Sequence, residues 1–156
     1  MSFLTERDMV DTFIASGYMR YLLSTGATAS CEVEPQGLFG IPDIVVIVGT
    51  DDGEARLTYA FESKLSNWRR ALVQAYRYKA FAEFSFVLMD DAHIGPALKH
   101  TCRFAGSNIG LLSINEHGFI CVHVAPTLEE PFSCELRTAV RKHLSRRTGL
   151  QPAQQT

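Results

Sequence analysis

The sequence lacks any run of apolar residues long enough to span a membrane, and its first residues lack the basic-then-apolar order of a secretion signal. We therefore expect no membrane partner and a cytoplasmic location. The four cysteines, Cys31, Cys102, Cys121 and Cys134, show no C-x-x-C spacing, which argues against a zinc site or a disulfide framework and favours reduced thiols. The five histidines show neither ligand spacing nor pairing with a cysteine, so we expect structural or surface roles for them.

A strong excess of one charge sign is also missing, because the formal net charge is −2. The total charge therefore gives no direct sign of a nucleic-acid binder. Positive charge is nevertheless concentrated in two groups: Arg69, Arg70, Arg77 and Lys79, and Arg137, Arg141, Lys142, Arg146 and Arg147. A solvated helix face is the ordinary explanation for the C-terminal group.

Repeats and linkers are absent too, and 156 residues suit one domain, which we place at 1–147 with a flexible tail over 148–156. Periodicity and turn residues predict helices over 5–23, 68–82, 96–105 and 134–147, and strands over 28–34, 43–48, 57–64, 83–89, 109–114 and 119–124. The strands over 43–48 and 57–64 are largely apolar on both faces, as expected for an α/β fold whose sheet is covered by helices on two sides.

These two strands also carry a cluster of charged residues, with Asp43 opening the first and Glu62-Ser63-Lys64 closing the second. A hairpin centred on Asp52-Gly53 makes paired positions sum to 105 and places Asp43 opposite Glu62. Side-chain alternation then puts Lys64 on the same face, while the Ser63 side chain turns away and leaves its carbonyl at the edge of the site. A cross-strand salt bridge is the alternative role for the three charges.

The first expected helix carries an acid on its apolar side. Glu6 lies four residues before Val10 and seven before Phe13, and both apolar residues belong to the inward face. Two interpretations stay open: Glu6 stabilises the positive end of the helix dipole, or it reaches the cluster around Asp43 as a third carboxylate.

The helix over 68–82 follows Lys64 closely and presents three polar groups together. Arg70, Gln74 and Tyr78 are spaced four residues apart, so they share one face. Packing of Tyr78 on the sheet is the simpler explanation for that residue. Burying Gln74 on that face without a polar partner would cost free energy, which favours a role beside the charged cluster.

Together these features resemble the PD-(D/E)XK nuclease superfamily over residues 5 to 90. The shared points are the order helix, strand, strand, strand, helix, strand, the pair Pro42-Asp43, the triplet Glu62-Ser63-Lys64, and a helix with Gln74 and Tyr78 like that of resolvase-like members. The resemblance implies a restriction-endonuclease-like αβββαβ core, with a mixed central sheet flanked by helices on both faces.

The same resemblance implies a metal-dependent endonuclease that hydrolyses DNA phosphodiester bonds. Asp43, Glu62 and the Ser63 carbonyl would hold Mg²⁺, with Mn²⁺ able to substitute. Lys64 would orient or deprotonate the attacking water, and Gln74 would position Lys64 or a phosphate.

Further residues have supporting roles under this interpretation. Glu6 and Tyr78 would lie in the outer shell of the site, and Arg69, Arg70 and Arg77 would contact DNA phosphates. The alternative is a catalytically inactive nuclease-like module that binds nucleic acid or a partner subunit. A homodimer or a partner subunit also stays open, with the last helix offering Leu136, Val140 and Leu144 as an interface.

Overall fold

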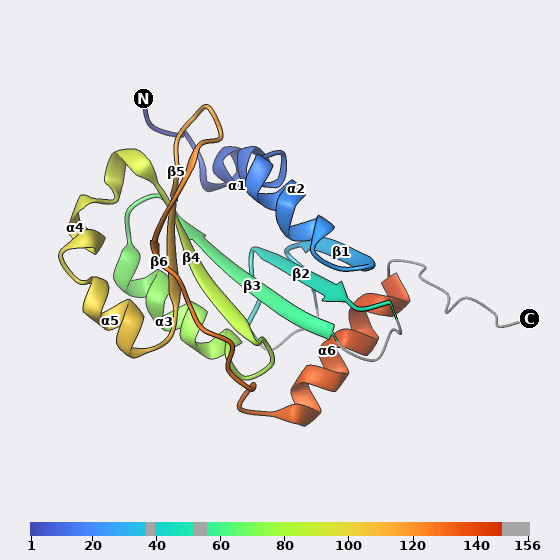
Figure 1. The fold of residues 1–156 in the computed structure, drawn as a ribbon. Helices are drawn as coiled ribbons and strands as arrows, with labels where there is room; N and C mark the ends of the chain where they lie inside the picture. The colour runs from blue at the N-terminus through green and yellow to red at the C-terminus, as the bar shows by residue number, and fades with distance from the viewer. Residues whose placement is uncertain (37–39, 52–55, 148–156) are drawn as a thin grey trace, which may run out of the picture.

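A computed structural model describes residues 1–36, 40–51 and 56–147 as an α/β structure with a six-stranded mixed sheet (Figure 1). The strands are β1 (Thr28–Val33), β2 (Ile44–Gly49), β3 (Arg56–Lys64), β4 (Phe84–Asp90), β5 (Gly110–Ile114) and β6 (Ile120–Val124). The α-helices are α1 (Glu6–Ile14), α2 (Gly17–Ser24), α3 (Trp68–Tyr78), α4 (Gly95–Leu98), α5 (Thr101–Gly106) and α6 (Cys134–Arg147), and a 3-10 turn, η1, spans Asp91–His93. None of the helices in these ranges combines the length and apolar character needed to cross a membrane.

The strands lie in the sheet in sequence order, from β1 at one edge to β6 at the other. β3, β4 and β5 run parallel, and the other neighbouring pairs are antiparallel. Parallel neighbours cannot be joined by a tight turn, so α3 connects β3 to β4 and the segment with α4 and α5 connects β4 to β5. The carboxyl ends of the three parallel strands therefore meet at one end of the sheet.

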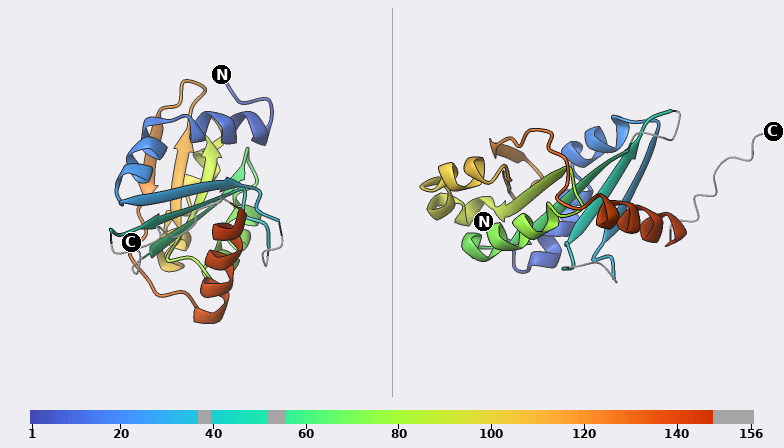
Figure 2. Two further views of the ribbon diagram at one scale, coloured as in Figure 1. Left: turned by 90° about the vertical axis from the view of Figure 1, so that its right-hand side faces the viewer. Right: turned by 90° about the horizontal axis from the view of Figure 1, so that it is seen from below.

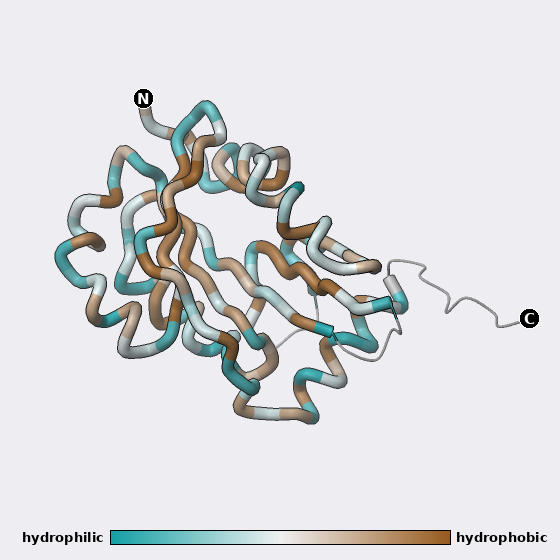
Figure 3. Tube along the Cα trace, in the orientation of Figure 1, coloured by the Kyte–Doolittle hydropathy of each residue, from teal (hydrophilic) through white to brown (hydrophobic). Residues whose placement is uncertain are grey.

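Helices cover both faces of the sheet, as the two views of Figure 2 show. Met9, Phe13 and Leu22 of α1 and α2 pack on one face against Ile44 and other inward residues. The opposite face packs against α3, α5 and α6 in two further apolar clusters. Figure 3 shows the hydrophobic residues concentrated along the central strands. The expected α/β class, with helices on two sides, is therefore confirmed.

The pairing of β2 with β3 follows the predicted register. Ile44 pairs with Phe61 and Val46 with Tyr59, so paired numbers sum to 105 throughout the ladder. The predicted turn at Asp52-Gly53 and the predicted tail over 148–156 lie outside the described residues. Because one step of slippage would turn every side chain to the other face, this register decides which groups meet at the strand ends.

The single helix expected over 5–23 is wrong, because the chain forms α1 and α2 with a break at Ser16. The Ser16 hydroxyl donates to the Phe13 carbonyl (2.6 Å) and accepts from the Met19 amide (3.3 Å). One hydroxyl thus satisfies the end of one helix and the start of the next, and Gly17 beside it has low helix propensity. The helix expected over 96–105 is likewise divided into α4 and α5, and the helix expected over 68–82 ends at Tyr78.

Helix α6 has the predicted bounds but not the predicted interface. Val140 and Leu144 are 3% and 2% exposed and pack with Val45 and Ile47 of the sheet, and Leu136 is partly buried beside them. The expectation that this apolar row contacts another subunit is therefore wrong, because the row covers the protein's own core.

A buried carboxylate attaches α6 to the sheet. Glu83 is 5% exposed, and its Oε1 accepts from Arg141 Nη2 (2.6 Å) and Arg137 Nη1 (3.3 Å). Its Oε2 accepts from the backbone amide of Thr58 in β3 (2.8 Å). The charge of Glu83 is therefore compensated from the helix and hydrogen-bonded from the sheet.

We predict that Glu83→Ala lowers the free energy of unfolding by about 2–4 kcal/mol, because it leaves a buried amide and two partly buried guanidinium groups without their acceptor. Urea unfolding measures this change. Glu130→Ala is the matched control, since Glu130 also pairs with Arg137 but its side chain is 79% exposed; its effect should stay within about 0.5 kcal/mol. Equal losses in the two variants would contradict a structural role for the buried carboxylate.

Candidate active site

The predicted site residues meet where β2 begins and β3 ends. Asp43 precedes β2, yet its backbone extends the ladder, because its amide donates to the Phe61 carbonyl (3.1 Å). Glu62 and Lys64 are near the carboxyl end of β3, and α3 contacts Glu62 through Tyr78. The confirmed register therefore brings Asp43 next to the acidic end of β3, as the sequence predicted.

Glu62 is the buried centre of the site, with 2% of its surface exposed. Its Oε1 lies 3.0 Å from Lys64 Nζ, and its Oε2 accepts a 2.5 Å hydrogen bond from the Tyr78 hydroxyl. A buried carboxylate is costly unless it is paired and hydrogen-bonded. Lys64 and Tyr78 supply both forms of compensation, one to each oxygen.

The electrostatics of this group favour a charged lysine. Burial raises the pKa of Glu62, although the hydrogen bonds from Tyr78 and Lys64 oppose the shift. Burial by itself lowers the pKa of Lys64, but hydrogen bonding and attraction to Glu62 outweigh it, so the net pKa of the amine is raised. Burial also raises the pKa of Tyr78, which keeps its hydroxyl protonated as a donor. Lys64 is therefore an ammonium in this arrangement and not a base.

Asp43 is bound to Ser63 and not to the lysine. Its Oδ2 accepts from both the amide and the hydroxyl of Ser63, each at 2.6 Å. The expectation that the Ser63 side chain turns away from the site is wrong, because Asp43 lies before β2 and its carboxylate reaches the strand edge. The Ser63 carbonyl accepts from Lys64 Nζ at 3.0 Å, and Asp43 Oδ1 has no donor among the described residues.

Glu6 reaches the cluster from the first turn of α1. Its Oε2 lies 3.5 Å from Lys64 Nζ, although the Glu6 side chain is 46% exposed. Of the two interpretations of this acid, the structure therefore supports contact with the site.

A small cavity of about 60 Å³ adjoins Asp43 and reveals an acid that the sequence did not single out. It is lined by Glu6, Arg7, Val10, Val33, Glu34, Asp43 and Ser63. Glu34 has a φ of 47°, an uncommon conformation for a residue other than glycine, and its amide donates to the Asp43 carbonyl (2.8 Å). In the sequence, the one feature that could have pointed to Glu34 as a residue of the site was its position as an acid at a strand end before Pro35.

The other predicted residues of α3 are not joined to the cluster. Gln74 Oε1 is buried without a hydrogen-bond partner among the described residues, so Gln74 does not position Lys64 here. Arg69, Arg70 and Arg77 are exposed, and the Arg69 guanidinium lies over the Trp68 ring at 4.6 Å. Tyr78 is the residue of this helix that contacts Glu62.

A comparison of the sequence with protein-family models and with curated proteins finds no match. Within the described ranges, no three or more His, Cys, Asp or Glu side chains are grouped so that they could hold a metal ion. The predicted ligand set has two such side chains and one backbone carbonyl, so it falls outside that kind of grouping.

We predict that Tyr78→Phe costs about 1–3 kcal/mol of stability near neutral pH, because Glu62 Oε2 is left buried without a donor. The hydrogen bond lowers the Glu62 pKa, so its removal should raise that pKa further. The loss should shrink as the pH falls and Glu62 becomes neutral. Urea unfolding at several pH values measures this trend.

The control for this variant is Tyr76→Phe, on the same helix, because Tyr76 is 47% exposed and its ring packs on Phe132. It should change stability little at any pH. A pH-independent loss in Tyr78→Phe would show that the hydroxyl does not act through the charge of Glu62.

Proposed function

We propose that the chain is a metal-dependent endonuclease that hydrolyses DNA phosphodiester bonds, built on a restriction-endonuclease-like core. The single observation that carries this proposal is the joining of Asp43, Glu62-Ser63-Lys64 and Tyr78 in one network at the end of a helix-covered sheet. The element order α1 to β4, with the first helix divided, agrees with that core. A cytoplasmic location is part of the proposal.

The oxygens of this network suit a hard divalent cation. Asp43, Glu62 and the Ser63 carbonyl offer oxygen ligands only, and Asp43 Oδ1 has no donor among the described residues. Lys64 Nζ lies 3.0 Å from both Glu62 Oε1 and the Ser63 carbonyl, so these oxygens already face a positive charge. Bound Mg²⁺, or Mn²⁺ in its place, would supply charge compensation at the phosphate and a site for water.

The protein's own residues would do the remaining work. With its raised pKa, Lys64 would orient the attacking water and offset phosphate charge as an ammonium, which favours this role over deprotonation. Tyr78 would fix Glu62, and Glu6 would act from the outer shell by holding Lys64. Gln74 keeps an unpaired buried oxygen that would accept a donor when substrate or Lys64 moves.

DNA would approach the exposed side of α3. Arg69, Arg70 and Arg77 are exposed there and would contact backbone phosphates. The chain would work with a homodimer partner or another subunit to gain the contacts that its small net charge does not provide.

We predict that the purified chain nicks or cuts DNA when Mg²⁺ or Mn²⁺ is present. Asp43→Ala and Lys64→Ala should each lower the rate by at least about 100-fold, because the first removes a ligand of the metal and the second removes a cation that offsets charge in the transition state. A gel assay on linear, branched, supercoiled and single-stranded DNA measures cleavage. Calorimetric titration of the protein with Mg²⁺ measures metal binding independently of cleavage.

Asp51→Ala and Lys99→Ala are controls that remove an exposed charge of the same kind elsewhere, and both should cleave like the wild type. Circular dichroism and thermal unfolding show whether each variant is folded. Undiminished cleavage by a folded Lys64→Ala would overturn the role of this lysine. Failure of the wild type on all four DNA forms would overturn the enzymatic proposal.

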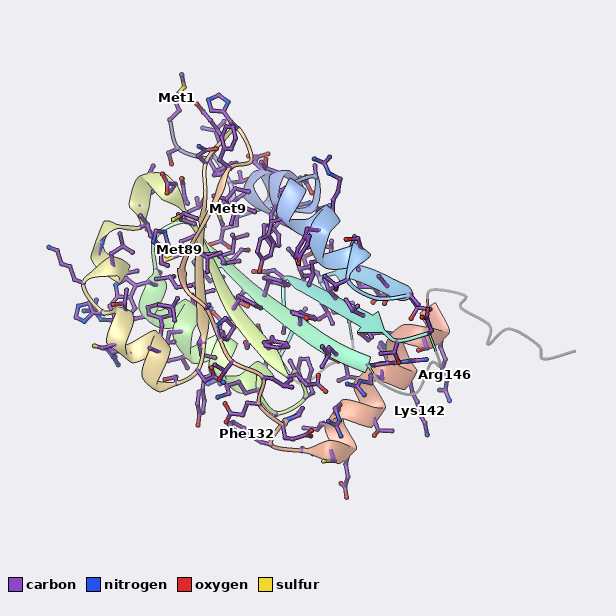
Figure 4. All side chains as sticks on the ribbon, in the orientation of Figure 1. Met1, Met9, Met89, Phe132, Lys142 and Arg146 are labelled. Carbon is purple, nitrogen blue, oxygen red and sulfur yellow. The ribbon has the colours of Figure 1, made fainter. Side chains whose placement is uncertain are left out.

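A second candidate function is a non-catalytic module that binds nucleic acid. Two observations favour it. The hydrogen bonds of Glu62 and of the Ser63 carbonyl are complete without a metal. A hollow of about 480 Å³ beside α6 is lined by Arg56, Thr138, Arg141, Lys142, Ser145 and Arg146, with no carboxylate among them. Figure 4 labels Lys142 and Arg146 near the end of this helix.

Under this second function, we predict that Lys142→Glu with Arg146→Glu weakens duplex binding and lowers the slope of log K against log salt by about two, one for each lost phosphate contact. Fluorescence anisotropy of labelled DNA over a salt series measures both quantities. Arg20→Glu with Lys99→Glu gives the same change of net charge at exposed positions on α2 and directly after α4. Equal weakening in the two double variants would assign the effect to total charge and not to this hollow.

A further inference from the structure

A second chain of polar side chains crosses the sheet edge at β5 and β6. Ser113 Oγ lies 2.7 Å from Asp91 Oδ1 and 2.8 Å from His123 Nε2. The other ring nitrogen of this histidine, Nδ1, lies 3.8 Å from Cys121 Sγ. Four groups from η1, β5 and β6 thus form one continuous series, Asp91, Ser113, His123 and Cys121.

This series lies outside the candidate active site. Lys64 pairs with Met89, Met89 with Ser113, and Ser113 with Cys121, so Cys121 is three strands away from Lys64, or about 14 Å at ~4.8 Å per strand. Met89, labelled in Figure 4, is fully buried between the two groups. The two sets of polar residues are therefore separate.

Counting protons fixes the direction of the hydrogen bonds. The Asp91 carboxylate can only accept, so the single hydroxyl proton of Ser113 must go to Asp91. Ser113 then has only lone pairs to offer, so His123 must donate from Nε2. A neutral imidazole carries one N–H, which leaves a lone pair on Nδ1 facing the Cys121 thiol.

The resulting arrangement is a thiol beside a base whose orientation is set by further partners. Ser113 is fully buried, which restricts the imidazole, whereas Cys121 is exposed on β6. A nucleophile within reach of a base that is itself held by a third group is the pattern of an activated nucleophile. The histidines were expected to have structural or surface roles, and the structure places one of them, His123, between a buried serine and a cysteine.

We propose that Cys121 is a reactive thiol and a site of covalent modification by small disulfides. The Cys121 proton passes to His123 Nδ1, and the thiolate sulfur attacks one sulfur of the disulfide. One S–S bond forms as the other breaks, so the Cys121 sulfur is oxidised and the departing sulfur is reduced. The departing thiolate takes the proton from His123, and the product is a mixed disulfide on β6. Cys121 has this reactivity whether or not the chain cuts DNA.

Glutathione disulfide is the probe that tests this site, with peptide-resolved mass spectrometry of the intact folded chain. Cys102 is an internal control, because it is also exposed but stands on α5 away from this series. We expect Cys121 to form the mixed disulfide at least roughly tenfold faster than Cys102. This factor is smaller than the rate enhancement that a positioned general base usually gives. Cys31 should be slowest, because burial raises the pKa of its thiol to about 11.

Two variants test the role of the relay. His123→Gln should bring the Cys121 rate down to that of Cys102, and Ser113→Ala should lower it less, because the base stays but is no longer oriented. The Cys102 rate in the same molecules reports whether the fold is intact and should not change. Equal rates at Cys121 and Cys102 in the wild type, or an unchanged Cys121 rate in His123→Gln, would overturn the proposal.

Discussion

The buried charge of Glu62 is the constraint on which the geometry of the site depends. Its two oxygens need separate partners, and these come from the same strand, through Lys64, and from α3, through Tyr78. The Tyr78 hydroxyl also lies 3.1 Å from the Ile41 carbonyl, so the segment leading to Asp43 lies against the same group, although the single hydroxyl proton goes to Glu62. Moving α3 or shifting the strand register would leave a carboxylate buried without a donor, which is among the costliest defects in a folded protein. The requirement to satisfy Glu62 therefore orders the strand end, the helix and the preceding loop together.

The charge balance of this site distinguishes it from an ordinary salt bridge. The ammonium of Lys64 is influenced by three carboxylates, those of Glu62, Glu6 and Asp43. Burial lowers the pKa of Lys64, but the hydrogen bond and the attraction to Glu62 outweigh it, with smaller contributions from Glu6 and Asp43, so the net pKa is raised. A structural pair is stabilised by matching its charges, whereas the small cavity beside this group is lined by three carboxylates, those of Glu6, Glu34 and Asp43, and by one cation, Arg7, which leaves a net negative field. That field is favourable for a cation. We therefore prefer the metal-dependent function over the non-catalytic module that binds nucleic acid.

The sequence predicted the structure correctly where side-chain alternation and turn residues determine strand pairing. Alternation and turn residues predicted the pairing of β2 with β3, and hence the approach of Asp43 to Glu62. The break at Ser16 was missed because a hydroxyl that caps one helix while ending another looks like an ordinary interior serine. The contacts of Glu83 with α6 and of His123 with Cys121 were missed for other reasons. The first joins distant elements and does not follow from spacing. The second could have been found, because Cys121 and His123 are two residues apart on a strand and share a face, but the orientation of the imidazole depends on a buried serine of the neighbouring strand.

The positions of two cationic side chains on β3 set the length of nucleic acid that could contact both of them. Lys64 ends this strand, and Arg56, which lines the basic hollow, begins it. Eight residue steps of about 3.4 Å separate the two, or roughly 27 Å. Base pairs rise about 3.4 Å along a duplex, so a ligand that reaches both positions needs about eight base pairs. A short oligonucleotide would engage either the carboxylate cluster of the proposed enzyme or the hollow of the second candidate function, and only a longer one would engage both. Cleavage and binding would then depend differently on DNA length, because chemistry needs the cluster alone and phosphate contacts accumulate along the strand.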